Sequence, residues 1–349
     1  MFRFKHIIAI TFCAMAYSVA MGEAIASTTV CVTNVADFQT ALDDANGSTS
    51  TTFIKVARGF YVLSGTALNF DSTATLQGQL DVEGGYSDDC STQIKNPALT
   101  VISAAGGSAV LQIQSPAGIS VRYLTIENGN APEYAGLFIQ SQLGGVIVDY
   151  NIIRNNGAAS SDGGFLILAD SPASTAVVHL EGNLIYSNTA LVNFGAGNVA
   201  NNGSGSTFVT NNTIVANLQP SGQGAGGLEV SPTSGTAYVS NNVGWDNKNA
   251  DLFWFNATSV VVLANNDFQV VGGTPDPSSG NNVSVDPGFV SASDFRLTAA
   301  SPLLAQGTLT PPGNLPTIDI EGHPRSYNNL VDMGAYERGN EIYGNSFDD

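Results

Sequence analysis

The sequence predicts an all-β protein folded as a parallel β-helix, a solenoid with three short strands per coil and a short N-terminal capping helix. Three observations lead to this prediction. An asparagine motif recurs along the middle of the chain, β-rich runs flank each copy, and a helical pattern precedes the first copies. A fixed internal period of a few tens of residues is typical of solenoid proteins, in which each repeat packs on its neighbours.

Each of the first four copies of the motif begins with one asparagine and ends with a second asparagine five residues later. The first asparagines are spaced 32, 29, 30 and 24 residues apart, which is long enough for one coil of three strands. The last copy has lost its second asparagine. The copies are Asn151–Asn156, Asn183–Asn188, Asn212–Asn217, Asn242–Asn247 and Asn266–Val271.

β-rich runs precede the motifs, and short strands that usually open with glycine follow them. Because side chains alternate across a strand, equivalent apolar positions in successive coils should stack inside the solenoid. One predicted inner stack is Val148, Leu180, Val209, Val239 and Leu263, and a second is Ile153, Ile185 and Ile214.

Asparagine suits the sharp bend of a coil for two physical reasons. It tolerates the left-handed backbone region better than other residues that carry a side chain. Its amide both donates and accepts, so that stacked copies can bond from coil to coil. We therefore expect the motif asparagines to form ladders that hold the scaffold together.

A short amphipathic helix is predicted over residues 34–45. Asn34 offers an N-cap, and Val35, Phe38 and Leu42 lie on one face. An unprotected solenoid end would expose strand edges, so we expect this helix to cover the first coil.

Residues 1–26 have the pattern of a secretory signal peptide, with a basic start, an apolar run over 7–20 and a small-x-small cleavage site. Cys31 and Cys90 then remain as a lone pair in an oxidising compartment, which predicts a disulfide. No CxxC motif and no paired histidine accompanies them, so no metal site is predicted.

The net charge of −18 argues against nucleic-acid binding, which requires a basic surface. It also disfavours anionic membrane surfaces and polyanionic substrates. Beyond residue 26 no stretch is apolar for long enough to span a membrane.

A distinct set of short motifs follows a Gly/Pro/Ser-rich stretch at 271–280. These motifs are Asp286–Phe289, Asp294–Leu297, Ser301–Leu303, Asp319–Arg325 and Asp332–Glu337. This run resembles the C-terminal module of bacterial pectin-lyase-like β-helix proteins, including those labelled choice-of-anchor Q domain. The resemblance implies a right-handed β-helix. We assign 27–270 to the β-helix with its cap and 271–338 to the module. The tail, 339–349, is similar to short tails on exported proteins of some Gram-negative bacteria.

Enzymes of the superfamily that this chain resembles gather carboxylates, either around calcium with a basic residue or as an acid–base pair. Their motifs are not matched here, and the sequence identifies no cofactor; Ca²⁺ would be implied only by a lyase site. Whether catalysis occurs is left open. The candidates for a divergent site are Asp162, Glu229, Asp246, Asp251 and Lys248.

The glycine-opened strands offer a candidate binding surface. If Leu137, Leu228 and Phe253 face inward, an outward column mixes aromatic and polar side chains, which suits sugar recognition. In pectate-lyase-like folds this strand set forms the floor of the substrate groove. The predicted ligand-binding residues of the column are Phe138, Asn198, Glu229 and Trp254.

The preferred hypothesis is a secreted or cell-surface protein of a Gram-negative bacterium that binds a polysaccharide or cell-surface glycan; a periplasmic location is the alternative. Two other functions stay open: a divergent polysaccharide lyase or glycoside hydrolase, and a structural or adhesive surface protein. The sequence leaves the oligomeric state undetermined.

Overall fold

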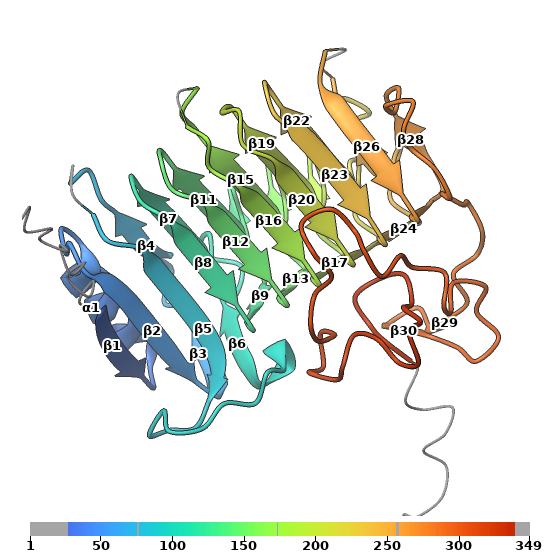
Figure 1. The fold of residues 1–349 in the computed structure, drawn as a ribbon. Helices are drawn as coiled ribbons and strands as arrows, with labels where there is room; N and C mark the ends of the chain where they lie inside the picture. The colour runs from blue at the N-terminus through green and yellow to red at the C-terminus, as the bar shows by residue number, and fades with distance from the viewer. Residues whose placement is uncertain (1–26, 75–76, 173, 256–257, 339–349) are drawn as a thin grey trace, which may run out of the picture.

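The computed structural model describes residues 27–74, 77–172, 174–255 and 258–338. They form a parallel β-helix whose coils stack side by side from the N-terminal to the C-terminal end (Figure 1). The predicted signal peptide and the tail 339–349 lie outside the described residues.

Three long parallel sheets run along the solenoid, and each coil contributes one strand to each sheet in its regular part. Sheet A has nine strands. They are β1 (Ser27–Val32), β2 (Thr51–Ala57), β5 (Leu80–Tyr86), β8 (Ile119–Arg122), β12 (Val146–Asp149), β16 (Val178–Glu181), β20 (Thr207–Thr210), β23 (Thr236–Ser240) and β26 (Val260–Ala264).

Sheet B follows sheet A in each coil across a sharp bend, and it has eight strands. They are β3 (Gly59–Val62), β6 (Thr100–Ser103), β9 (Thr125–Glu127), β13 (Ile152–Arg154), β17 (Leu184–Tyr186), β21 (Thr213–Val215), β24 (Val243–Trp245) and β27 (Asp267–Phe268). The 3-10 turn η1 (Pro97–Leu99) leads into β6.

Sheet C closes each coil and also has eight strands. They are β4 (Leu68–Asp71), β7 (Leu111–Ser115), β11 (Leu137–Ser141), β15 (Phe165–Ala169), β19 (Gly197–Asn201), β22 (Leu228–Pro232), β25 (Leu252–Phe253) and β28 (Val271–Gly272). The predicted plan of three strands per coil is therefore confirmed.

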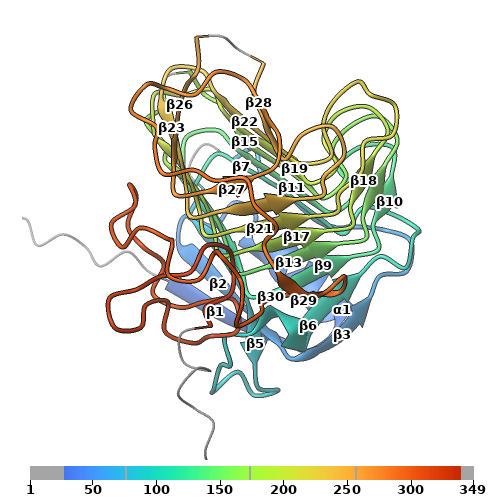
Figure 2. The ribbon, with the colours of Figure 1, turned by 90° about the vertical axis from the view of Figure 1, so that its right-hand side faces the viewer.

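Three coils add a fourth, two-residue strand between sheets B and C. These strands are β10 (Asn130–Ala131), β14 (Gly157–Ala158) and β18 (Thr189–Ala190), and they pair into a small parallel sheet. We call this sheet, with the loops that lead from its strands to sheet C, the wall. Figure 2 looks along the stack and shows β10 and β18 to the side of sheet C.

The interior of the solenoid is a continuous apolar core. Val148, Leu180 and Val209 are paired in register across sheet A and are fully buried. Ile153 and Ile185 are paired in the same way in sheet B. The predicted inner stacks are thus confirmed, because a parallel register superposes equivalent positions of successive coils.

The motif asparagines form two buried ladders, as predicted. In the first ladder the backbone N–H and the amide of Asn183 both donate to Oδ1 of Asn212, at 3.0 Å each. The same contacts repeat from Asn151 to Asn183 and from Asn212 to Asn242. The second ladder contains Asn156, Asn188, Asn217 and Asn247.

The left-handed backbone conformation does not belong to the ladder asparagines, contrary to the prediction. It belongs to the residue that precedes each of them. Before the first ladder these residues are Tyr150, Gly182, Asn211, Asn241 and Asn265, with φ between 54° and 65°. The chain turns at this preceding residue, which leaves the ladder side chain free to point into the interior.

The N-terminal end of the solenoid is covered by α1 (Val35–Ala45), which confirms the predicted cap. Asn34 caps the helix by accepting from the N–H of Asp37 at 2.9 Å. Phe38, Ala41 and Leu42 are buried against the first coil. The predicted disulfide between Cys31 and Cys90 is present and joins β1 to the loop after β5.

Solenoid pairing continues beyond residue 270, where the module was predicted to begin. β28 pairs with β25, and Asn282 adds a rung to the first ladder by accepting from the backbone N–H and the amide of Asn266. The sequence signal was weak because Asn282 follows Asn266 by only 16 residues.

The remaining chain folds back along the outside of the bend between sheets A and B (Figure 1). It contains the antiparallel pair β29 (Phe289–Ser291) and β30 (Asp294–Leu297). The amide of Asn211 donates to the carbonyls of Asp332 and Gly334, at 3.2 Å each. The amide of Asn241 donates to the carbonyl of Thr308 at 2.9 Å.

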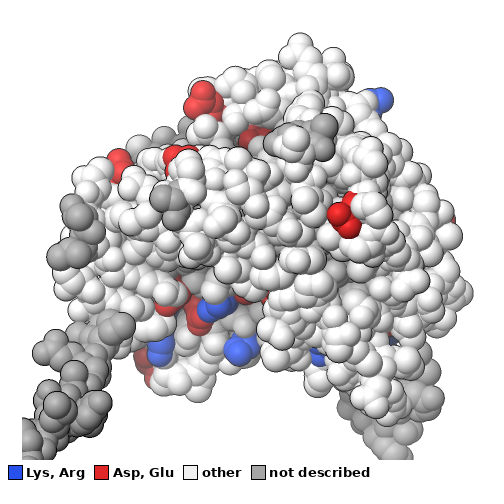
Figure 3. Space-filling view, turned by 45° about the horizontal axis from the view of Figure 1, so that its top comes forward, with Lys and Arg blue, Asp and Glu red and all other residues white. Residues whose placement is uncertain are grey.

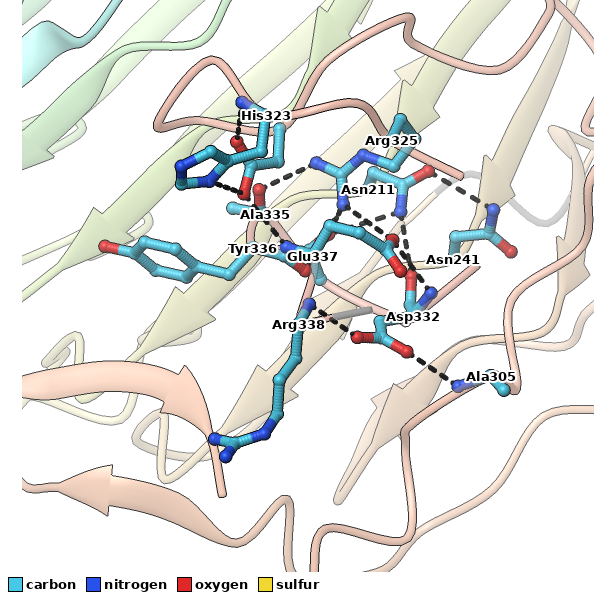
Figure 4. Close-up of polar contacts among 12 residues, drawn as sticks. Asn211, Asn241, Ala305, His323, Arg325, Asp332, Ala335, Tyr336, Glu337 and Arg338 are labelled. Carbon is cyan, nitrogen blue, oxygen red and sulfur yellow. Dashed lines mark hydrogen bonds and ion pairs between the residues drawn. The ribbon is translucent and has the colours of Figure 1, made fainter. Parts of the chain in front are cut away.

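Arg325 organises the interior of this segment (Figure 4). Its side chain is 1% exposed and donates to the carbonyls of Gly334, Ala335 and Tyr336. The carboxylate of Glu337 lies 3.9 Å away and offsets the buried charge. Backbone carbonyls of the module therefore accept hydrogen bonds both from the solenoid and from its own buried arginine.

Candidate functional site

The outer face of sheet C and the wall enclose an open pocket of about 730 Å³, which we call the sheet C pocket. Strands β7 and β11 supply one side, and wall residues 130–134 supply the other. Parallel strands place equivalent outward side chains side by side, so this surface repeats in columns along the solenoid.

A stacked aromatic pair lines the pocket. The ring of Tyr134, from the wall, lies 4.5 Å from the ring of Phe138, and the two planes differ by 12°. Phe138 was predicted to face outward, and it does, in register with Gln112 and Leu166. Its ring is only 8% exposed because Tyr134 covers it. Tyr134, which sequence reasoning missed, is half-exposed and gives the pocket its more accessible ring.

Amide side chains accompany the aromatic pair. Gln112, Gln114 and Gln140 all line the pocket and are half-exposed. The amide of Gln140 donates to Asp170 at 2.6 Å, which fixes one of the three. Gln114 and Gln140 are paired in register, and Gln112 lies two residues before Gln114 on β7. Their amides present donors and acceptors, the groups that recognise hydroxyls.

Asn198 and Glu229 occupy the same outer column further along the solenoid, as predicted. The amide of Asn198 donates to Glu229 Oε2 at 2.6 Å, and the hydroxyl of Ser231 donates to Oε1 at 2.7 Å. Burial raises the pKa of Glu229 above its ordinary value, and the Ser231 hydrogen bond partly opposes this shift. Asn198 and Glu229 thus make a polar stretch of the column, supported by Ser231 from the next column.

Trp254 does not belong to the outer column, and its predicted role in a sugar-binding surface is wrong. The strand is shifted by one residue from the predicted register, so that Leu252 pairs with Leu228 and Phe253 pairs with Glu229. Trp254 therefore points into the core and is 5% exposed. A one-residue slip moves every side chain of a strand to the opposite face.

The five catalytic candidates occupy different structural settings. Asp251 is buried at the end of the second ladder, where it accepts from the amide of Asn247 at 2.8 Å. Asp246 and Lys248 flank that ladder asparagine with exposed side chains. Only Asp162 and Glu229 are associated with the wall and the outer face of sheet C.

Asp162 has a structural contact that accounts for its position. Its side chain is 1% exposed, and Oδ1 accepts from the backbone N–H of Phe194 at 3.2 Å. Burial raises the pKa of this carboxyl to about 7, and the charge of Glu229 adds to the increase. The Asp162 carboxyl thus ties one wall loop to the next.

A second outward aromatic pair, Tyr186 and Trp245, is covered by the C-terminal module. Both rings pack against an apolar cluster that includes Phe295, Ile320 and Tyr336. The Tyr186 and Phe295 rings are 5.0 Å apart. These aromatic residues on sheet B therefore hold the module in place.

A column of charges that sequence reasoning missed runs across the outer face of sheet A. Arg122 lies between Glu83 and Asp149, at 3.1 Å and 3.5 Å, and His179 contacts Glu181 at 2.8 Å. Figure 3 shows acidic and basic side chains gathered in a hollow of the surface. Burial, together with the charge of Glu181, raises the pKa of Asp149 to about 8. Arg122 and its two partners are separated by about a coil in sequence, so stacking brings them together, whereas His179 and Glu181 lie on one strand.

Among the described residues, one group has the composition of a metal site. The ligand atoms of Asp319, Glu321 and His323 lie within 4.8 Å of one another. The Asp319 carboxylate already accepts from the backbone N–H groups of Glu321, His323 and Glu337. These hydrogen bonds close a turn of the module, and the turn explains why the three side chains lie together.

No helix in the described part of the chain has the length and apolar character needed to cross a membrane. No family model, curated protein or solved structure matches this chain. The geometry of the sheet C pocket is therefore the best guide to what the protein does.

Proposed function

We propose that this protein is exported and binds a polysaccharide or cell-surface glycan in the sheet C pocket. The observation that carries the proposal is the half-exposed ring of Tyr134, which is backed by Phe138 and stands beside Gln112, Gln114 and Gln140.

This combination matches the chemistry of a sugar. A sugar ring has an apolar face that stacks on an aromatic ring, and its rim carries hydroxyls that both donate and accept. Phe138 fixes the plane of Tyr134, which reduces the conformational entropy lost when a ligand binds. The volume of about 730 Å³ lies within the range typical of small-molecule sites.

The disulfide between Cys31 and Cys90 supports an exported location, since such bonds persist in oxidising compartments. A location outside the cell would also bring the pocket into contact with surface glycans.

The test is retention of the purified protein on a panel of immobilised polysaccharides. Tyr134→Ala removes the exposed ring and should abolish retention on whichever polysaccharide holds the parent protein. The matched control is Tyr238→Ala on sheet A, where Tyr238 stacks on Phe208 at 5.6 Å. Retention of both variants at the parent level, or loss in both, would refute the assignment to this pocket.

The same incubations test the alternative of catalysis. Absorbance of unsaturated products reports a lyase, and new reducing ends report a hydrolase. If the bound polysaccharide is converted and Glu229→Gln stops the conversion, the protein is an enzyme and binding alone is an incomplete description.

A further inference from the structure

A second aromatic cluster lies further along the outer column of sheet C. It consists of Phe194 from the wall and Phe253 and Phe255 from the last coils. The Phe253 and Phe255 rings meet edge to face at 4.4 Å, and Phe194 lies 6.1 Å and 6.0 Å from them. Phe255 is 65% exposed, which is unusual for a large apolar side chain in a packed cluster.

Two features position this cluster. Phe253 occupies the outer column beside Glu229, and its neighbour on the other side is Gly272. A Cβ atom at Gly272 would lie 2.2 Å from the Phe253 ring, so any side chain there would displace the ring. Phe194 is held by its backbone N–H, which donates to the buried carboxyl of Asp162.

The two aromatic sites are connected by one continuous surface. Strands β11, β15, β19, β22 and β25 are successive neighbours in sheet C. Strand spacing of about 4.8 Å separates β11 from β25 by about 19 Å. Half-exposed side chains of the next outward column, Leu168, Ala200 and Ser231, leave the path between them open to solvent.

The charge along this path is negative. Between β7 and β22 the strands of sheet C and the adjoining wall segments contain no lysine or arginine. Carboxylates do lie on or beside them, at Glu133, Glu229 and, directly after β15, Asp170. On this stretch a uronic acid would bring its charge to these carboxylates, whereas neutral hydroxyls can donate to them. The exposed Lys248 lies beyond it, in the loop that leads into β25.

We propose that the outer column of sheet C binds an extended, uncharged oligosaccharide that contacts both the Tyr134 ring and the exposed Phe255 ring. This inference depends on the proposed glycan-binding function and adds the charge class and the minimum length of the ligand. The chain of sugars would run along the solenoid axis, across the strands.

The test is calorimetric titration with oligosaccharides of increasing length from the polysaccharide that retains the protein. Affinity should rise with length until the ligand spans both aromatic sites. Phe255→Ala should then weaken binding of a hexasaccharide about tenfold, the order expected for one stacking contact, while binding of a disaccharide stays at the parent level. Tyr134→Ala should weaken both ligands.

The matched control is Phe60→Ala, which removes a ring that is 63% exposed on β3, away from sheet C. The inference is overturned if affinity does not rise with length, if Phe255→Ala behaves like Phe60→Ala, or if a uronate hexasaccharide binds as tightly as a neutral one. Retention of no polysaccharide at all overturns the proposed function as well, so the two failures are distinguishable.

Discussion

Replacement of Asn212 by alanine interrupts the first ladder at its centre. The Asn212 side chain is fully buried. Its amide donates to the carbonyl of Leu180 at 2.7 Å and to Asn242 Oδ1 at 2.9 Å. Its Oδ1 accepts from the backbone N–H and the amide of Asn183. Alanine removes these bonds and leaves the buried N–H of Asn183 without the acceptor it has in the parent protein.

The magnitude follows from these contacts. At about 1 kcal/mol of net stability for each hydrogen bond, loss of the bonds above lowers the free energy of unfolding by ~4 kcal/mol. Urea unfolding followed by circular dichroism measures this change. Asn69→Ala is the matched control because Asn69 is exposed on β4, and it should change the stability by less than ~0.5 kcal/mol. Equal midpoints for the two variants would refute the argument that the ladder stabilises the coils.

Three further predictions concern stability. Replacing Cys31 and Cys90 by alanine should lower the free energy of unfolding by about 2–4 kcal/mol, measured by urea unfolding, since their bridge closes a separation of 59 residues; unchanged stability would contradict this. The free energy of unfolding of the parent should fall as the pH rises from about 4 to about 7, and Asp162→Asn should reduce that fall. The raised pKa of about 7 means that the folded parent holds a proton that the unfolded chain releases near pH 3.9, so rising pH destabilises it; an unchanged pH profile would oppose this. Trp254→Ala should lower the free energy of unfolding by about 3–5 kcal/mol, because the ring lies in the core. The folded variant should still be retained on the glycan. A variant of unchanged stability that is no longer retained would place the ring on the surface.

The scaffold was predictable because its signals repeat. Each ladder asparagine and each inner apolar position recurs once per coil, so that several weak local signals agree on one register. The backbone conformation at the bend was assigned to the wrong residue because two asparagines often adjoin there, as in Asn211-Asn212 and Asn241-Asn242. Spacing alone does not show which of the two turns the chain and which joins the ladder.

The outer column was predicted correctly up to Glu229 and incorrectly after it. The run from Leu252 to Phe255 is apolar throughout, so alternation gives no register there. In the structure Asp251 fixes the register, because its carboxylate accepts from Asn247 on one side and from the N–H of Val270 on the other. Val270 lies on the next coil, 19 residues from Asp251, so only the stacked coils reveal that contact.

The exposed residues of the site were the hardest to predict. Tyr134 lies in an irregular wall loop without a periodic counterpart, and the sequence does not show that its ring covers Phe138. Tyr186 and Trp245 resemble a second exposed aromatic set until the C-terminal module covers them. That module has no repeat, so its position on the bend between sheets A and B depends on tertiary contacts alone.

The most direct test of the central claim is hydrogen–deuterium exchange of the protein with and without the polysaccharide fragment that it retains. Binding in the sheet C pocket predicts slower exchange in peptides that cover residues 107–114 and 130–141, which include the pocket lining except Ala67. Peptides from sheet A and from the module at 289–338 should exchange at the same rate in both samples. Protection confined to sheet A or to the module, with no change at 130–141, would contradict the claim.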